Sequence, residues 1–172
     1  MSGSAPSADR VLLVGMMGAG KTTVGHALGA LLGWPYFDND ELLLRAVGKD
    51  TRRVQEEDGE LALRRAESAA LDVALTEGGP LVAGVAGGVV LDPLDAQRLR
   101  SGGFVVWLRA ELTTLARRVA GTDRPWLAGD PLHSLQQLYA GREGLYESVA
   151  SLVVDVDVAP PDLIALHIAE FL

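Results

Sequence analysis

Residues 11–32 read VLLVGMMGAGKTTVGHALGALL, and this stretch decides the fold. An apolar run at 11–14 leads into residues 15–22, where a glycine, four residues and then Gly-Lys-Thr match the phosphate-binding P-loop pattern. Glycines let successive backbone N–H groups surround phosphate oxygens, and the helix that follows directs its positive end at them. The alternative is a glycine-rich turn that binds nothing. The strand–loop–helix context favours binding of a nucleoside triphosphate.

The side chains of this loop predict how the nucleotide is held. Lys21 brings a positive charge to the β- and γ-phosphates and is a candidate catalytic group. The hydroxyl of Thr22 suits Mg²⁺, which prefers oxygen ligands. The predicted ATP-binding residues of the loop are Gly18, Ala19, Gly20, Lys21, Thr22 and Thr23.

Composition and charge exclude several classes of protein. The 172 residues suit one domain spanning 1–172, and 48% apolar with 22% charged residues is ordinary for a globular chain. A net charge of −8 argues against a nucleic acid or an anionic membrane as the main partner. The chain has no cysteine, which excludes disulfides and thiolate chemistry. The three histidines show no metal-ligand spacing, so we expect packing or surface roles for them.

The chain carries no apolar run long enough to span a membrane, which takes about 18 residues. The Ser-, Gly-, Ala- and Pro-rich start lacks the apolar centre of a signal peptide. We therefore expect residues 1–9 to form a flexible leader on a cytoplasmic protein. We also expect the protein to be a monomer.

Strand-like and helix-like segments alternate along the chain. We expect strands at 10–14, 35–37, 81–83, 104–108 and 152–156. We expect helices at 21–32, 41–47, 60–76, 111–119, 133–146 and 162–171, a further helix starting at Asp92-Pro93, and a helical turn at 51–57. This order predicts an α/β fold of three layers, with a five-stranded, mainly parallel sheet flanked by helices.

Two carboxylates follow the second predicted strand, where functional residues of open α/β sheets gather. Asp38 can help to hold Mg²⁺ through its waters, while Asp40 can contact or deprotonate an attacking hydroxyl. The alternative is a structural one, in which Asp40 caps the helix predicted from Glu41. The P-loop upstream favours the functional interpretation.

Three further segments are candidates for ligand contacts. Arg64 and Arg65 form either a solvated helix face or a clamp for a carboxylate. Because the side chains of adjacent helical residues point in different directions, we expect only one of the two to reach a pocket. Residues 86–88, Ala-Gly-Gly, are either a turn or a place where a ligand approaches the backbone. Residues 121–130 are either a surface loop or a mobile lid that carries Arg124 to a phosphate.

Taken together, these motifs resemble the shikimate kinase family of small P-loop kinases over nearly the whole chain. The matched features keep the family's order along the sequence. They are GMMGAGKTT at 15–23, DND at 38–40, DGE at 58–60, LRRAE at 63–67, AGG at 86–88, RPWL at 124–127 and REGLY at 142–146. The resemblance implies a P-loop kinase fold in which helices within 39–79 bind the substrate.

The resemblance also implies roles for the nucleotide side of the site. Lys21 and Thr22 would serve the phosphates and Mg²⁺, and Asp38 would lie near the waters of the metal. Arg117 would stack on adenine, and Arg124 would close onto the transferring phosphate as a catalytic group.

On the substrate side, the resemblance implies a small carboxylated cyclic alcohol as the partner of ATP. Asp40 would contact the reacting hydroxyl, and Arg64 with Arg142 would clamp the carboxylate. Gly87 and Gly88 would pack against the ring. In-line phosphoryl transfer depends mostly on positioning and charge neutralisation, which such a cationic set supplies.

Several positions depart from the family pattern. Ala86 replaces the first of three usual glycines, and Gln55 and Leu63 stand where aromatic residues usually line the ring. Arg52 and Arg53 add charge in a region that is usually less basic. A polar wall discriminates strongly among substrates, because a buried polar group without a partner is costly.

Three functions follow from these observations. The first is transfer of the ATP γ-phosphate to the 3-hydroxyl of shikimate. The second is phosphorylation of another small polyol or cyclitol acid, and the third is nucleotide binding without catalysis.

Overall fold

The apolar run ahead of the P-loop forms the central strand of a parallel sheet in the computed structural model, which describes residues 9–122 and 129–172. The strands of these residues are β1 (Arg10–Val14), β2 (Tyr36–Phe37), β3 (Leu81–Gly84), β4 (Phe104–Arg109) and β5 (Leu152–Asp155). They pair in the order β2-β3-β1-β4-β5, and every pair is parallel. The predicted α/β fold with a five-stranded sheet is confirmed.

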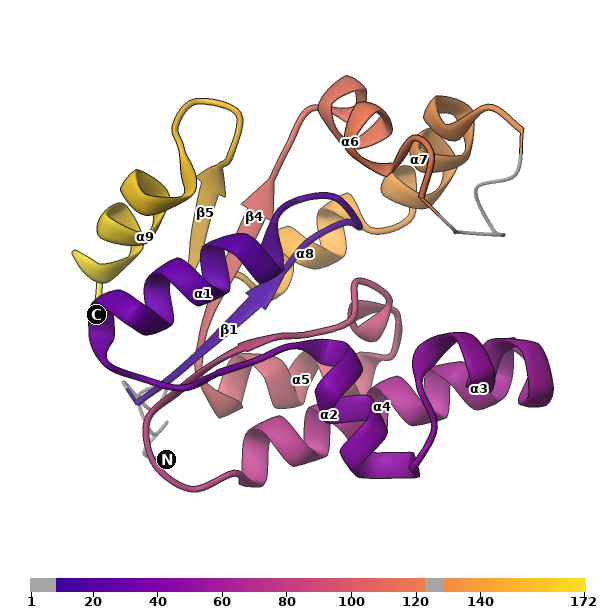
Figure 1. The fold of residues 1–172 in the computed structure, drawn as a ribbon, viewed down its shortest axis with the longest axis horizontal. Helices are drawn as coiled ribbons and strands as arrows, with labels where there is room; N and C mark the ends of the chain where they lie inside the picture. The colour runs from indigo at the N-terminus through magenta and orange to yellow at the C-terminus, as the bar shows by residue number, and fades with distance from the viewer. Residues whose placement is uncertain (1–8, 123–128) are drawn as a thin grey trace.

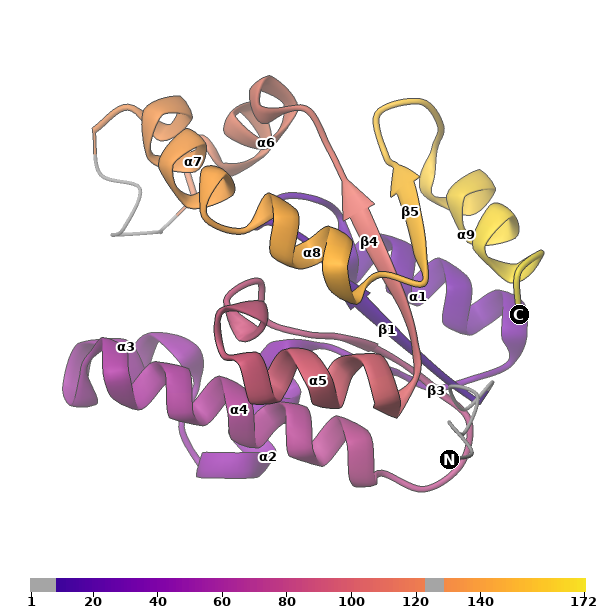
Figure 2. The same ribbon diagram turned by 180° about the vertical axis from the view of Figure 1, so that it is seen from behind.

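Helices cover both faces of the sheet. They are α1 (Lys21–Leu32), α2 (Asn39–Val47), α3 (Thr51–Asp58), α4 (Glu60–Thr76), α5 (Pro93–Gly102), α6 (Leu112–Val119), α7 (Pro131–Ala140), α8 (Glu143–Val149) and α9 (Pro161–Ala169), with a short 3₁₀ turn at Val89–Leu91. In Figure 1, α1 and α9 lie side by side in front of the sheet. Figure 2 shows α5 and α8 on the opposite face. This burial on both sides explains why β1 is apolar almost throughout.

The close fit of α1 against the sheet depends on small residues. A Cβ added at Gly25 would lie 2.1 Å from the ring of Tyr36, and one at Gly29 would lie 2.8 Å from the carbonyl oxygen of Trp34. The ring of Tyr36 therefore fills the space between α1 and β2. This packing brings the phenol to the end of β2, beside the predicted carboxylates.

The structure corrects the predicted helix at 133–146, which is two helices and not one. α7 ends at Ala140 and α8 begins at Glu143, and the N–H of Arg142 donates to the carbonyl of Tyr139 at 2.9 Å in the turn between them. Arg142 has φ −121° and ψ −24°, outside the helical geometry of its neighbours. The apolar period continues across the break, so the sequence pattern did not reveal it.

Two smaller differences concern the substrate side. Residues 51–57, expected to be a helical turn, belong to the full helix α3 with Asp50 as its N-cap. The predicted leader falls mostly on residues 1–8, which lie outside the described residues. Among the helices that the structure describes, none is long and apolar enough to cross a membrane.

Candidate functional site

The P-loop joins the end of β1 to the start of α1 at the carboxyl edge of the sheet. Gly15, Gly18 and Gly20 have positive φ values of 147°, 82° and 92°. A Cβ at Gly15 would stand 2.6 Å from the carbonyl oxygen of Leu108 on β4, so a side chain cannot fit there. The ammonium of Lys21 donates to the carbonyl oxygens of Gly15 at 2.8 Å and of Met16 at 3.1 Å. The loop thus holds its own lysine at the position where phosphates are expected.

A hydrogen-bonded group of oxygens lies beside the loop, at the end of β2. Thr22 Oγ1 donates to Asp38 Oδ2 at 2.6 Å, and the hydroxyl of Tyr36 donates to the same oxygen at 3.2 Å. Burial, and then the negative charge of Asp38, raise the pKa of Tyr36, so this phenol remains a hydrogen-bond donor at neutral pH. The strand end, the loop and the first helix therefore fix the Asp38 carboxylate.

The structure corrects the expected helix cap at this point. α2 begins at Asn39, and its cap is Asp38, whose Oδ1 accepts from the backbone N–H of Asp40 at 3.2 Å. Asp40 lies in the first turn, and its Oδ1 accepts a hydrogen bond from Thr51 Oγ1 at 2.5 Å. Asp38 thus accepts from a backbone N–H at the start of α2, and the carboxylate of Asp40 does not cap the helix, which was the structural alternative considered for it.

The paired arginines of α4 separate as predicted. Arg64 faces the cleft, while Arg65 is exposed on another side of the helix. The guanidinium of Arg64 donates to Glu67 Oε2 at 2.8 Å. A Cβ added at Gly88 would lie 2.0 Å from Arg64 Nη1, so the guanidinium rests directly on this glycine.

The break between α7 and α8 places a second arginine near the first. Arg142 is only 6% exposed, and a Cβ added at Gly87 would lie 3.5 Å from its Nη1. The hydroxyl of Tyr146 donates to the carbonyl of Gly87 at 2.7 Å, which anchors the glycine segment to α8. Burial raises the pKa of Tyr146, and the nearby positive charge of Arg142 opposes that shift. Arg64 from α4 and Arg142 from the turn before α8 thus converge on residues 87–88.

One continuous cleft of about 1350 Å³ connects these groups. The P-loop forms one end of the cleft, and α3, α4 and the glycine segment form the other. Of the predicted site residues that the structure describes, the cleft brings together Gly18, Ala19, Gly20, Lys21, Thr22, Thr23, Asp38, Asp40, Arg64, Gly87, Gly88 and Arg142. Gln55, Leu63 and Ala86 line the cleft as well, so the departures from the family pattern lie where the substrate is expected.

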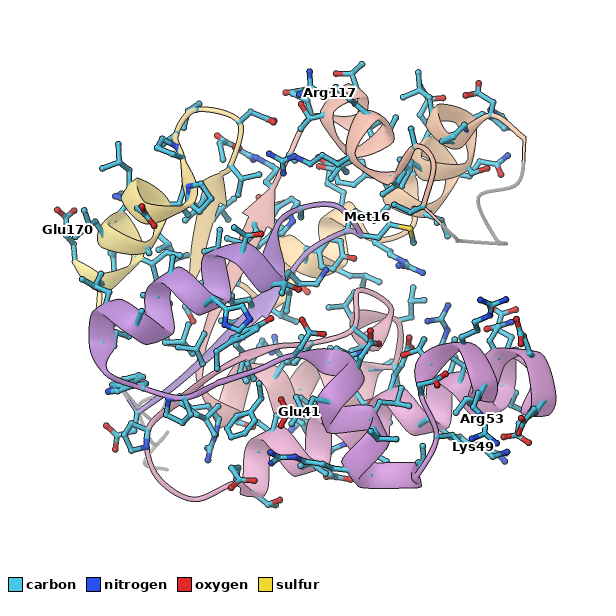
Figure 3. All side chains as sticks on the ribbon, in the orientation of Figure 1. Met16, Glu41, Lys49, Arg53, Arg117 and Glu170 are labelled. Atoms are coloured by element: carbon cyan, nitrogen blue, oxygen red, sulfur yellow. The ribbon has the colours of Figure 1, made fainter. Side chains whose placement is uncertain are left out.

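Arg117 does not line the cleft, so its stacking on adenine stays a prediction. This residue is exposed on α6, where Figure 3 shows it at the outer surface of the molecule. Its neighbour Arg118 lines the cleft and donates from Nη1 to the carbonyl oxygen of Gly18 at 3.0 Å. Both arginines are exposed, and because adjacent residues on a helix point about 100° apart, only Arg118 lines the cleft. The predicted Arg124 and most of the lid at 121–130 fall on residues 123–128, which lie outside the described residues.

Sequence reasoning missed three residues that contact the site. Tyr36 and Thr51 each donate a hydrogen bond to one of the two aspartates, and Arg118 touches the P-loop. The Tyr36 contact is local to the end of β2, the Thr51 contact joins the start of α3 to the start of α2, and the Arg118 contact depends on the rotation of α6 about its axis. The sequence pattern carried no signal for Thr51, whereas the prediction for Arg117 had already directed attention to α6.

The oxygens at the end of β2 suit Mg²⁺. This ion binds through one or two protein oxygens, several waters and the phosphates of a nucleotide. Thr22 Oγ1 and the carboxylate of Asp38 provide such oxygens within hydrogen-bond distance of each other. Within residues 9–122 and 129–172 there is no group of three or more His, Cys, Asp or Glu side chains that could cage a metal. The donor set therefore fits an ion that the nucleotide brings with it.

Comparisons with known proteins agree with this geometry. A family model described as shikimate kinase matches residues 17–172. A shikimate kinase of Bordetella pertussis is 40% identical over 152 residues, covering 87% of this chain and 72% of the relative. Shikimate kinase 2 of Sodalis glossinidius is 34% identical over 162 residues, covering 91% of this chain and 92% of the relative.

A solved structure extends the likeness to three dimensions. The shikimate kinase from Acinetobacter baumannii in complex with shikimate superposes with a TM-score of 0.89 at 29% identity. The match covers 96% of this chain and 93% of that one. The P-loop, the two aspartates and the two converging arginines are thus set in a fold shared with kinases of one kind, and this chain belongs to the shikimate kinase family.

Proposed function

We propose that this enzyme transfers the γ-phosphate of ATP to the 3-hydroxyl of shikimate, giving shikimate 3-phosphate and ADP. The observation that carries the proposal is the cleft itself. Asp40 and two arginines face a P-loop across one continuous space, so that an acidic cyclic alcohol and a nucleotide can meet there. Membership of the family and the shikimate bound to the Acinetobacter baumannii enzyme support the choice of substrate.

The substrate would be held by its carboxylate. The guanidinium groups of Arg64 and Arg142 make charge-assisted hydrogen bonds to carboxylate oxygens, while Gly87 and Gly88 let the ring approach the backbone. This orientation brings the reacting hydroxyl to Asp40. The carboxylate of Asp40 accepts the hydroxyl proton as the hydroxyl oxygen bonds to the γ-phosphorus, and the bond from that phosphorus to the β–γ bridging oxygen breaks to release ADP.

On the nucleotide side, the backbone N–H groups of residues 18–23 would bind the phosphates. Lys21, which now donates to two loop carbonyls, would exchange them for phosphate oxygens. Thr22 and Asp38 would hold Mg²⁺ directly and through its waters. The bound ion neutralises charge on the phosphates during transfer. We retain Arg124 as the proposed group that reaches the transferring phosphate.

Two further properties belong to this proposal. We also propose that the enzyme acts as a monomer. The use of ATP supports a cytoplasmic location.

A panel of acceptors tests the proposal. ADP release with ATP and Mg²⁺ is measured for shikimate, quinate, gluconate and several cyclitols, each with and without a chelator. We expect saturable turnover on shikimate that stops when the metal is removed. Turnover on another acceptor but not on shikimate would overturn the substrate assignment. If no acceptor of the panel gives ADP release although the protein still binds nucleotide, a non-catalytic nucleotide-binding protein would be favoured.

The polar wall of the cleft favours a second candidate. Gln55 lines the substrate half where the family usually has an aromatic residue, Thr51 adds a second polar group there, and Ala86 replaces a usual glycine. Polar groups at such a wall reject ligands that leave them without partners. The candidate is phosphorylation of a more highly hydroxylated cyclic acid, and the quinate and cyclitol members of the panel test it.

The arginine pair on α6 provides a matched test of the nucleotide half. We expect Arg118→Ala to weaken ATP binding by about 3- to 30-fold, because it removes a cation that lies beside the P-loop. Arg117→Ala removes the same charge from the neighbouring position, which does not line the cleft, and tests the predicted stacking on adenine, because wild-type ATP binding in this variant would exclude that role. Titration calorimetry with a non-hydrolysable ATP analogue measures both constants. Equal losses in the two variants would show that the contact of Arg118 with the P-loop has no special share in the affinity for ATP.

A further inference from the structure

A threonine that the proposed mechanism does not use lies against the proposed base. Thr51 is the first residue of α3 and lines the cleft, and its hydroxyl donates to Asp40 Oδ1 at 2.5 Å. Hydroxyl-to-carboxylate bonds of this kind are short because they are charge-assisted. We propose that Thr51 is a positioning residue that sets the orientation of the Asp40 carboxylate toward the reacting hydroxyl. This inference rests on the proposed function, since it assumes that Asp40 receives the proton.

The start of α3 is built to hold Thr51 in place. The carboxylate of Asp50 accepts from the backbone N–H of Arg53 at 2.8 Å, which caps the helix just ahead of Thr51. Val54 is 3% exposed and packs in the core, so one side of this polar helix is anchored. Thr51 and Gln55 are four residues apart and face the cleft together. The hydroxyl is therefore presented from a fixed helix end.

The hydrogen bond also decides which oxygen of Asp40 meets the substrate. Oδ1 accepts from Thr51, and the backbone N–H of Asp40 is held by Asp38. Among the residues that the structure describes, no group donates to Asp40 Oδ2. That oxygen is the one available for a substrate hydroxyl. Without Thr51, the exposed carboxylate is free to turn among several rotamers, only some of which direct an oxygen at the acceptor.

A simpler explanation is that the hydrogen bond of Thr51 only stabilises the packing of α3 against α2. The two explanations predict different kinetic effects when the hydroxyl is removed. A structural tie alters folding stability and the affinities of both ligands together. A positioning contact acts on the chemical step, because small displacements of a reacting group lower the rate steeply.

Three substitutions test the positioning role. Thr51→Val keeps the shape but removes the hydroxyl, Thr51→Ser keeps the hydroxyl, and Thr76→Val removes a hydroxyl that bonds only to carbonyls of its own helix. We expect Thr51→Val to lower kcat roughly 10- to 100-fold, with KM for ATP unchanged. Thr51→Ser should keep most of the wild-type kcat, and Thr76→Val all of it. Wild-type kcat in Thr51→Val, or an equal loss in Thr51→Ser, would overturn the inference.

A double variant separates positioning from damage to the fold. In an Asp40→Asn background, removing the Thr51 hydroxyl should cause little additional loss of kcat, because the group that it orients no longer accepts a proton. A purely structural role predicts that the two losses multiply. If wild-type enzyme is silent on the whole acceptor panel, the proposed function fails. If the wild type is active and the two losses multiply, only the role of Thr51 fails.

Discussion

Asp40→Asn is expected to lower kcat by about 10²- to 10⁴-fold while leaving ATP binding close to that of the wild type. The substitution keeps the shape of the side chain and an oxygen that can accept from Thr51 Oγ1. It removes the negative charge and the capacity to take a proton at neutral pH. Steady-state kinetics on shikimate, with calorimetry for the ATP analogue, measures the two effects separately.

The control for Asp40→Asn is the same change at Asp72. That carboxylate lies on α4, outside the cleft, in a partly exposed ion pair with Arg98. Such pairs contribute little to stability, so Asp72→Asn should leave kcat unchanged. An Asp40→Asn enzyme with full activity would remove Asp40 from proton transfer. Loss of ATP binding in that variant would instead indicate that the carboxylate supports the nucleotide site.

Arg64→Ala is expected to raise KM for the acidic substrate strongly, with KM for ATP unchanged. The substitution deletes a charged hydrogen-bond partner of the substrate carboxylate, at a cost of about 1.5–3 kcal/mol, or roughly 10- to 150-fold. Acceptors that lack a carboxylate should not be affected, because they cannot use the clamp. Initial rates over a range of each acceptor test both statements.

Arg65→Ala is the matched control, since it removes an equal charge from the exposed side of the same helix turn. Arg64→Ala also leaves Glu67, which is 8% exposed, without its ion-pair partner. The melting temperature of Arg64→Ala is therefore measured, and Arg64→Lys is added as a variant that keeps a positive charge. Equal KM values in Arg64→Ala and the wild type would exclude Arg64 from the clamp.

Residues that are adjacent in the chain were enough to predict the strand, loop and helix of the P-loop region. The sequence from Val11 to Leu32 specifies a buried strand, a glycine turn and a helix, and each follows from residues that are adjacent in the chain. The separation of Arg64 from Arg65 followed from helix geometry alone. The parallel order of the strands followed from their alternation with helices.

The differences from the prediction arose at a helix start and where the outcome depended on contacts between distant segments. Asp38 caps α2 because it directly follows β2 and precedes the first residue of the helix. The carboxylate of Asp40 instead accepts a hydrogen bond from Thr51. The break at Arg142 depends on packing of α8 against the glycine segment, which the apolar period does not encode. Arg118, which the sequence analysis did not name, reaches the P-loop because of the rotation of α6 about its axis. The last two features are decided by tertiary contacts that sequence spacing does not determine, whereas the cap is local and was misplaced because the predicted helix started two residues too late.

Gly87 lies where the two halves of the cleft meet. A Cβ added there would lie 2.9 Å from the carbonyl oxygen of Gly15 in the P-loop and 3.5 Å from Arg142 Nη1. The P-loop and the arginine proposed to bind the carboxylate therefore both lie against the backbone of Gly87. Thermodynamic linkage makes any influence across it reciprocal, so the factor by which bound nucleotide changes the affinity for the acid equals the factor by which the acid changes the affinity for the nucleotide. One coupling free energy therefore relates the binding of nucleotide and acid, and it can be measured by titrating either ligand in the presence of the other.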